Sequence, residues 1–459
     1  MTTTGFKIIG AFVGLLIAVP AAFAAPGFFI DANKKIASAA NAVDPSGGMH
    51  MAYVDAVPLA DHPKAYYRYC SAGQNCASPD QWQGTQIGDR VTEVQLAVNA
   101  AGQPRMLLRV ASEQTNLEYE YHYAECNANC GSDSSWKIVM VRGTFGTSIF
   151  DLYDDTSPQR YFALDPQGRP RFVYIDRNYP ADPDHIGSFY VWCDGDCTQA
   201  ENWRETLFTN VSPYDFEPVR YPSLTFTKQG APRIVAGLYT ISDSEPSGLY
   251  YFSCDINCDQ REGWQRVYLS ERGGGTDPSW DLKLDAQDRP RVAFYMGYRD
   301  QSDGEYLVYL WCDTGCLNDD NWFYNDPGLP YRSGRHPVLA LTQDNKPRIA
   351  YMNGNTDGLG YLRCDGDCET DHPQWVNETL ETTSTLDAEY PVPLPATCDA
   401  GLWTTMTPVL SLDGAGNPFL AYDAEYDTRC WYQDPTGNNP PDYRFSQLWR
   451  AVRGVIRGQ

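Results

Sequence analysis

The feature that most constrains this chain is a pattern of two apolar runs around a short turn, which returns seven times along the sequence. In the copy FALDPQGRPRFVYID, which begins at Phe162, one run ends at Asp165 and the next starts at Phe172. An aromatic run follows in most copies, and then a tight turn that ends at a tryptophan such as Trp203. Each copy therefore predicts four short antiparallel strands joined by three connections.

The chemistry of the first turn agrees between the copies. The first run ends in a side chain that can accept hydrogen bonds from the turn backbone: Asp44, Asn99, Asp165, Thr227, Asp285, Thr342 or Asp413. Three residues later stands a residue type that tolerates positive φ: Gly47, Gly102, Gly168, Gly230, Asp288, Asn345 or Gly416. This combination is typical of a hairpin turn that ends in a left-handed residue.

A repeat of roughly 55 to 70 residues with four strands in each unit indicates a propeller blade and not a helical solenoid. We expect an all-β fold, a seven-bladed β-propeller of four-stranded antiparallel blades that occupies residues 25–459 as one domain. The blades should start near residues 36, 94, 160, 222, 280, 337 and 408. Phe28 to Ile30 could add an edge strand to the last blade and so close the ring.

The N-terminal residues are expected to lie outside this fold. Lys7, an apolar stretch from Ile8 to Val19 and a small-residue pattern ending at Ala24 predict a signal peptide over residues 1–24. The protein should then be secreted, periplasmic or at the cell surface. Because the apolar character continues to Ile30, an uncleaved membrane anchor is the alternative. The net charge of -24 makes nucleic acid and anionic membranes poor partners, and we expect a monomer.

The chain has 14 cysteines, which in an exported protein favour disulfide bonds over metal binding. Six local pairs follow the third strand of six copies: Cys70/Cys76, Cys126/Cys130, Cys193/Cys197, Cys254/Cys258, Cys312/Cys316 and Cys364/Cys368. The two others, Cys398 and Cys430, are expected to bridge each other. In the altered seventh copy we expect Cys430 to keep the first cysteine position and Trp449 to act as the late tryptophan.

The recurring L-x-L-D-x-x-G-x-P-[HR]-[IV]-A-Y, followed by an aromatic strand and a tryptophan, resembles bacterial secreted sialidase-like (BNR-type) β-propeller repeat proteins. The resemblance covers nearly the whole mature chain and implies the propeller fold. Such repeats occur in hydrolases, lectins and surface proteins, so the resemblance implies no single activity. The sequence contains no S-x-D-x-G-x-x-W Asp-box.

Loop lengths predict where a site should lie. The first turn of each copy is constant and the third nearly so, while the other two connections vary in length. Because strand direction alternates, the constant turns should share one face of the disk and the variable loops the other, where sites are usually built. Residues just before the first strand, such as Tyr221, Asp281, His336 and Thr407, should lie near the mouth of the central channel.

Aromatic, acidic and arginine side chains in these variable regions resemble a sugar-binding set. The ligand-binding candidates are Tyr221, Arg220, Glu217, Trp280, Asp281, Arg335, His336 and Tyr390. We expect an exported binding module for a carbohydrate or protein ligand. One alternative is a glycan-processing hydrolase or lyase that uses channel-mouth carboxylates such as Asp281, Glu217 or Glu389, and another is a structural or adhesive surface protein.

Two further patterns have more than one interpretation. Arg105, Arg171, Arg233, Arg291 and Arg348 share one position of the repeat, which could form an anion-binding ring. Because repetition usually indicates a structural role, we favour stems packed between blades and guanidinium groups paired with strand-end carboxylates. We expect no cofactor, although the acidic segments 151–155 and 182–184 could hold a structural Ca²⁺ ion.

Overall fold

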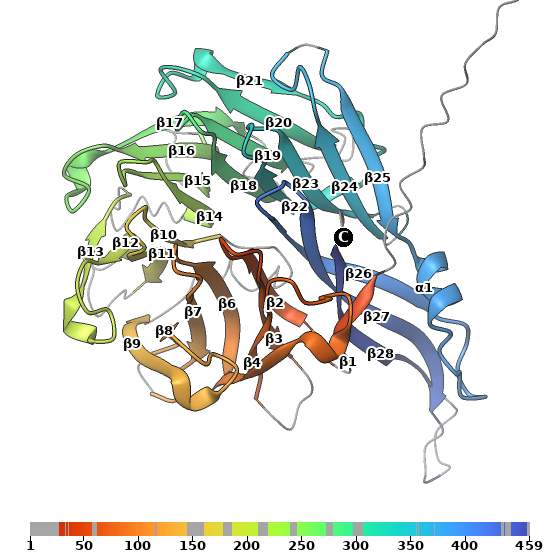
Figure 1. The fold of residues 1–459 in the computed structure, drawn as a ribbon. Coiled ribbons are helices and arrows are strands. Elements are labelled where there is room, and N and C mark those ends of the chain that lie inside the picture. Colours follow the sequence, from red (N-terminus) through yellow and green to blue (C-terminus); the bar gives the residue numbers. More distant parts are fainter. Residues whose placement is uncertain are drawn as a thin grey trace, which may run out of the picture.

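Seven four-stranded antiparallel sheets stand in a ring, as Figure 1 shows, so the predicted seven-bladed β-propeller is confirmed. The computed structural model describes residues 27–32, 34, 36–56, 62–114, 117–144, 160–177, 186–209, 219–238, 246–271, 279–296, 306–354, 356, 358–370, 372–432, 436 and 442–456. The first strands of successive blades contact one another in a closed circle, which places them innermost around the central channel. Among the described residues, no helix is long and apolar enough to span a membrane.

In blades one to three the strands follow chain order from the channel outward. Blade one contains β2 (Ile36–Val43), β3 (Met49–Asp55), β4 (Lys64–Cys70) and β5 (Gln83–Asp89). Blade two contains β6 (Val91–Val98), β7 (Pro104–Ala111), β8 (Tyr119–Cys126) and β9 (Trp136–Thr144). Blade three contains β10 (Phe162–Leu164), β11 (Pro170–Arg177), β12 (Ile186–Cys193) and β13 (Trp203–Leu207).

Blades four to six repeat the same order. Blade four contains β14 (Val219–Phe226), β15 (Pro232–Leu238), β16 (Gly248–Cys254) and β17 (Trp264–Ser270). Blade five contains β18 (Ser279–Leu284), β19 (Pro290–Met296), β20 (Tyr306–Cys312) and β21 (Trp322–Asn325). Blade six contains β22 (Ser333–Leu341), β23 (Pro347–Asn353), β24 (Gly358–Cys364) and β25 (Trp375–Glu381).

The ring is closed by the N-terminus. Blade seven takes three strands from the C-terminal part of the chain, β26 (Leu402–Leu412), β27 (Pro418–Tyr432) and β28 (Asp442–Ile456). Its outermost strand is β1 (Phe28–Ala32), which pairs antiparallel with β28 and lies beside the blue C-terminal strands in Figure 1. The edge strand expected at Phe28 to Ile30 is therefore confirmed.

The six local disulfides form as predicted, and each closes the third turn of its blade. The two Cα atoms of every pair lie 5.7–5.9 Å apart, within the usual range for a disulfide. The confirmed bridges are Cys70–Cys76, Cys126–Cys130, Cys193–Cys197, Cys254–Cys258, Cys312–Cys316 and Cys364–Cys368.

The second cysteine of each bridge has a further role that the sequence did not predict. In five blades its backbone carbonyl accepts a hydrogen bond from Nε1 of the tryptophan six residues later; these cysteines are Cys76, Cys130, Cys197, Cys258 and Cys316. In blade six the turn is one residue longer, and the contact becomes indirect. The Cys368 carbonyl accepts from Asn325 Nδ2 at 2.7 Å, and Trp375 Nε1 donates to Asn325 Oδ1 at 3.0 Å. The disulfide turn therefore also orients the tryptophan.

Blade seven corrects one expectation. Cys430 lies on the second strand, opposite Arg444, whereas in blades two to six the first cysteine ends the third strand opposite the tryptophan. Trp449 lies opposite Tyr426, so neither residue takes the predicted position. The reason is that the fourth strand comes from the N-terminus, so this blade has no third turn to close. The predicted Cys398–Cys430 bridge forms, but it ties β27 to the segment before β26.

Aromatic pairs join neighbouring blades. In blades two to six the tryptophan that opens the fourth strand packs edge-on against a third-strand tyrosine of the preceding blade, as Trp136 does on Tyr67, with 5.0 Å between the ring centroids. A single-turn 3-10 helix precedes this strand in five blades: η1 (Pro79–Gln81), η2 (Asp133–Ser135), η3 (Ala200–Asn202), η4 (Arg261–Gly263) and η6 (Asp319–Asn321). The one α-helix among the described residues, α1 (Thr383–Glu389), lies between blades six and seven. Each tryptophan–tyrosine pair between neighbouring blades contributes about 0.5–1.5 kcal/mol to stability beyond the effect of burial.

The two ends of the blades differ as the loop lengths predict. Turns of adjacent blades bond to each other, with Lys228 N donating to Asp288 Oδ1 and Ala286 N to Asn345 Oδ1. The six local disulfides lie beside these turns, and this end is called the hairpin face below. The opposite end, where the second and third strands are connected, is called the loop face. The acidic segments 151–155 and 182–184 lie outside the described residues.

Candidate functional site

Four blades meet at one buried carboxylate on the innermost strands. Asp281 of β18 is 1% exposed. Its Oδ1 accepts hydrogen bonds from Ser223 Oγ at 3.0 Å and from Lys283 Nζ at 2.8 Å. Its Oδ2 accepts one from the Leu339 backbone N at 2.9 Å and lies 3.7 Å from Arg160 Nε. Blades three, four, five and six thus each contribute a group to this contact, which we call the Asp281 cluster.

The cluster brings two cations to the centre of the ring. Burial lowers the pKa of both Arg160 and Lys283, and the neighbouring Asp281 carboxylate opposes this in each case. The Lys283 side chain is 35% exposed. At the equivalent position the other six first strands carry small residues: Ala42, Ala97, Ala163, Thr225, Ala340 and Ser411. Lys283 is therefore the one charged side chain among these seven described positions.

Three first strands are distorted where they approach the loop face. Tyr221, His336 and Thr407 have φ angles of 47°, 50° and 52°, values that L-residues rarely adopt. Each precedes a proline, and the pairing register of its strand shifts at this point. Because proline cannot donate to the ladder, the strand bulges and the preceding side chain is redirected. Such strained positions cluster at functional sites.

The predicted aromatic and histidine candidates form the wall of this region. Trp280 is 3% exposed, donates from Nε1 to the Tyr221 carbonyl at 2.8 Å and packs its ring against Phe294. His336 is 5% exposed, and its backbone N donates to Ser279 Oγ at 3.1 Å. The structure brings both residues close to the cluster, but it packs the Trp280 ring against neighbouring residues instead of presenting it as an open platform.

The other candidates are distributed differently. Arg335 donates from Nε to the Tyr295 hydroxyl at 3.2 Å, and Arg220 lies on β14 opposite Gly237. The Tyr390 ring stacks over the buried guanidinium of Arg453 at 4.7 Å and contacts Phe29 on the outermost strand of blade seven. Tyr390 is therefore not part of the Asp281 cluster. Glu217 lies outside the described residues.

Sequence reasoning missed two members of the cluster, Ser223 and Lys283. Both lie inside first strands, whereas the candidates were sought in the variable connections. The available signal was a departure from the repeat at a position that is otherwise Ala, Ser or Thr, which singles out Lys283. The X-Pro pairs before the first strands of blades four, six and seven were a second signal.

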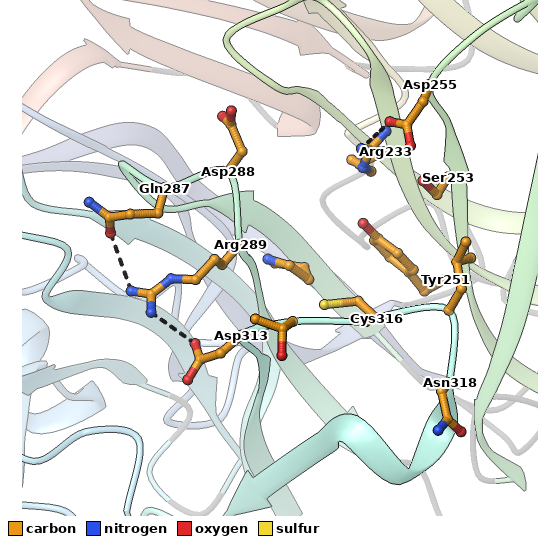
Figure 2. A pocket seen from close by; sticks show the side chains of 14 residues that line it. Arg233, Tyr251, Ser253, Asp255, Gln287, Asp288, Arg289, Asp313, Cys316 and Asn318 are labelled. Atoms are coloured by element: carbon orange, nitrogen blue, oxygen red, sulfur yellow. Dashed lines mark hydrogen bonds and ion pairs between the residues drawn. The ribbon is translucent and has the colours of Figure 1, made fainter.

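A separate pocket of about 500 Å³ lies on the hairpin face between blades four and five (Figure 2). Blade four contributes Arg233, Tyr251, Ser253 and Asp255. Blade five contributes its first turn, around Arg289, and its disulfide turn, from Asp313 to Asn318. The variable-loop argument did not predict a pocket on this face.

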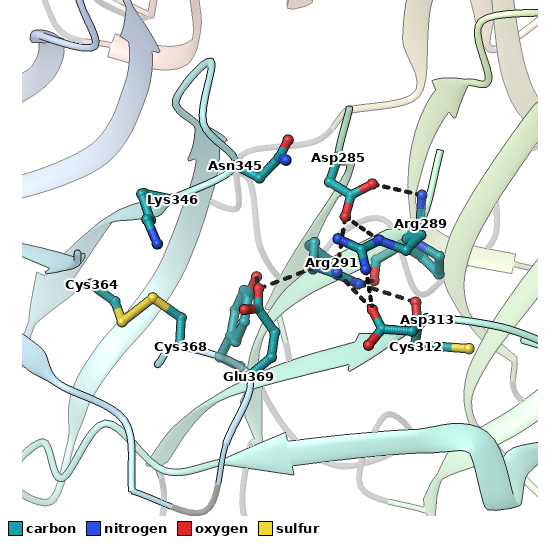
Figure 3. A network of polar contacts seen from close by, with 12 residues as sticks. Asp285, Arg289, Arg291, Cys312, Asp313, Asn345, Lys346, Cys364, Cys368 and Glu369 are labelled. Atoms are coloured by element: carbon teal, nitrogen blue, oxygen red, sulfur yellow. Dashed lines mark hydrogen bonds and ion pairs between the residues drawn. A yellow bond between two sulfur atoms is a disulfide. The ribbon is translucent and has the colours of Figure 1, made fainter. Parts of the chain in front are cut away.

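In blades three and five the repeated arginine pairs with a strand-end carboxylate, as we expected, whereas in blades four and six it pairs with an aspartate of the disulfide turn. Arg291 donates to Asp285 at 2.9 Å and to Asp313 at 2.9 Å, as Figure 3 shows. It also donates to the Cys312 carbonyl at 3.1 Å. Arg171 makes the equivalent contacts with Asp165 and with the carbonyl of Cys193. The guanidinium thus ties the first turn to the disulfide turn within a blade. In blade one His50 replaces it.

Comparisons with known proteins find similar folds. No family model and no curated protein matches the chain. A solved protein of unknown function from Dyadobacter fermentans is similar, with a TM-score of 0.46 and 10% identity over 95% of this chain and 99% of that one. An α-L-arabinanase from Penicillium chrysogenum has a TM-score of 0.48 and 12% identity over 78% and 98%. A sialidase from Streptococcus pneumoniae has 0.42 and 9% over 94% and 70%.

Proposed function

We propose that this protein is an exported β-propeller that binds a carbohydrate or protein ligand at the mouth of its central channel, on the loop face. The observation that carries the proposal is the Asp281 cluster, in which residues that the blades do not share converge on the channel. The strained backbone at Tyr221 and His336 in the adjoining strands supports the same location. Seven disulfide bonds support an oxidising compartment outside the cytosol.

The chemistry of the cluster suits binding better than hydrolysis. A glycosidase needs a carboxyl group that can give or take a proton and a second carboxylate at a defined separation. The oxygens of Asp281 already accept hydrogen bonds from Ser223, Lys283 and the Leu339 N, with Arg160 nearby. Lys283 donates to Asp281 and to the Leu282 carbonyl, so one of its three N–H groups remains for a ligand hydroxyl or carbonyl oxygen. The Arg160 guanidinium, which faces Asp281 through Nε, carries four further N–H groups.

Lys283→Ala tests this proposal, because alanine is the residue at this position in blades one, two, three and six. Binding of the full chain to a glycan array should weaken about tenfold or more, the usual effect of losing a charge-assisted hydrogen bond. The matched control is Lys137→Ala, which removes an exposed lysine from the outer strand β9 and should leave binding unchanged.

Equal losses in the two variants would contradict the proposed location. Turnover assays on glycosides with the same proteins separate the alternatives. Turnover that disappears in Asp281→Asn, with the fold retained by circular dichroism, would favour the hydrolase or lyase instead of the binding module.

A further inference from the structure

In two other blades a carboxylate lies at a position where blade four has none. The pocket between blades four and five lies at this position. In blade five, Tyr309 OH donates to Glu369 Oε1 at 3.3 Å, and Arg291 Nε lies 3.4 Å from the same oxygen. Glu369 comes from the disulfide turn of blade six, directly after Cys368 (Figure 3). The fold therefore holds a carboxylate between the repeated tyrosine and the repeated arginine.

Blade two satisfies the same pair from a different position. Tyr123 OH donates to Glu125 Oε2 at 3.2 Å, and Arg105 Nε lies 3.8 Å from that oxygen. Glu125 is the cross-strand partner of Arg105 on β8. Two unrelated sequence positions thus deliver a carboxylate to one place, which indicates that this place favours an anionic oxygen.

Blade four has the tyrosine and the arginine but neither carboxylate. Ser253 is the cross-strand partner of Arg233, where blade two has Glu125. Leu317 directly follows the second cysteine of the next blade, where Glu369 stands one blade later. Both residues are described, and both line the pocket together with Arg233 and Tyr251.

Ser253 also leaves space beside the tyrosine ring. In blades three and five the corresponding residue is a tryptophan that stacks on the tyrosine, with ring centroids 5.8 Å apart for Trp192 on Tyr190. Serine cannot cover the Tyr251 ring in this way. Figure 2 shows the Tyr251 hydroxyl pointing into the space that the labelled side chains surround. Burial raises the pKa of Tyr251 to about 12, so its hydroxyl remains a donor at neutral pH.

We propose that this pocket binds the carboxylate of an acidic sugar, a uronic acid residue, between Arg233 and Tyr251. The remaining wall favours a sugar over an acidic peptide, because Asp255, Asp288 and Asp313 offer acceptors that match hydroxyl donors. Asp255 is paired with Arg233 at 2.6 Å, Asp313 with Arg289 at 3.1 Å, and Asp288 accepts from the Lys228 N at 2.9 Å. A volume of about 500 Å³ lies in the range of small-molecule sites.

This site lies on the hairpin face, so the inference does not depend on the ligand proposed for the channel mouth. It is tested by saturation-transfer NMR on the full chain with D-glucuronate and D-galacturonate as probes. D-glucose, which carries a hydroxymethyl group in place of the carboxylate, is the control probe. We expect the uronates to bind at millimolar concentration and glucose to bind at least about tenfold more weakly.

Two variants copy carboxylates that the fold already accommodates. Leu317→Glu reproduces Glu369 and Ser253→Glu reproduces Glu125, so each should occupy the place and weaken uronate binding about tenfold or more. Leu317→Gln, of the same size without the charge, should leave binding unchanged. The inference would be overturned if Leu317→Glu and Leu317→Gln bound equally, if glucose bound as well as the uronates, or if an oligoglutamate peptide bound in preference.

Discussion

At the residue scale, one position of the repeat makes buried polar contacts within its blade with different side chains. In five blades an arginine at this position donates to the carbonyl of the first disulfide cysteine, as Arg171 does to Cys193. In blades three and five it also bonds the aspartate of the first turn. In blade one, His50 takes this place, with Nε2 at 3.2 Å from Asp44 Oδ2 and Nδ1 at 2.6 Å from Tyr67 OH. Unlike arginine, histidine titrates near neutral pH. Among the contacts made by these five arginines and His50, only those of His50 therefore depend on pH in that range.

The pH dependence of this contact has a definite sign. Burial lowers the pKa of His50 below its usual 6.5, although Asp44 opposes the shift. As the pH falls below about 6.5, the unfolded chain binds a proton at His50 before the folded chain does, so the free energy of unfolding decreases. Urea titrations at about pH 7 and pH 5 should therefore show less loss of stability in His50→Arg than in the wild type.

The control for this prediction is His62→Arg, since His62 is exposed. It should lose as much stability as the wild type over the same pH interval. An identical pH dependence in His50→Arg and in the wild type would show that His50 contributes nothing to the acid sensitivity.

At the element scale, ring closure rests on the short strand β1. Its five residues cover the edge of β28 and pack against blade one, with Phe28 6.5 Å from Trp82 between ring centroids. An uncovered edge strand invites pairing with another chain, so β1 both completes the sheet and protects it. The first and last strands of the domain thus depend on each other.

Ile30→Asp tests this closure. Ile30 is 5% exposed in the core shared by blades seven and one, and a carboxylate there would lack a partner. We expect a loss of about 3 kcal/mol or more in the free energy of unfolding, together with association visible by light scattering. Ile138→Asp on the outer strand β9, where the isoleucine is 44% exposed, should cost about 0.5 kcal/mol or less. Equal denaturation midpoints would refute the role of β1.

The repeated elements were predictable from sequence because the residues of each turn determine its backbone conformation. Asp165 accepts from the N atoms of Gln167 and Arg169, and Gly168 has φ of 76°, as the pattern required. Blade seven was predicted less well, because Cys430 and Trp449 match the repeat in residue type but not in register. Pairing partners that are distant in sequence, such as β1 and β28, set that register.

The candidate site was harder to predict for a different reason. Sequence indicates that Trp280 and His336 lie near the channel, but not that Trp280 packs into the core against Phe294. The direction of a side chain at a bulge depends on the shift in pairing register. Such shifts occur at Tyr221 and His336, and they cannot be inferred from loop length. Lys283 lies inside a regular strand, where only comparison between blades singles it out.

At the scale of the whole molecule, the propeller separates what the blades share from what they do not. The hydrogen bonds of the repeated arginines, the tryptophan–tyrosine ring contacts and the local disulfides recur around the ring and stabilise the propeller. The Asp281 cluster on the innermost strands and the pocket on the hairpin face between blades four and five are both departures from the repeat. The same propeller therefore supports two chemically different positions without a change in topology.

Hydrogen exchange of the full chain tests the central claim, that the ligand is held at the channel mouth on the loop face. The ligand to use is the carboxylate-free glycan that an array retains most strongly, so that the pocket on the hairpin face is not involved. Protection should concentrate in residues 219–223, 279–283 and 333–338. Protection that concentrates in the turns at 44–48 and 285–289 would contradict the claim.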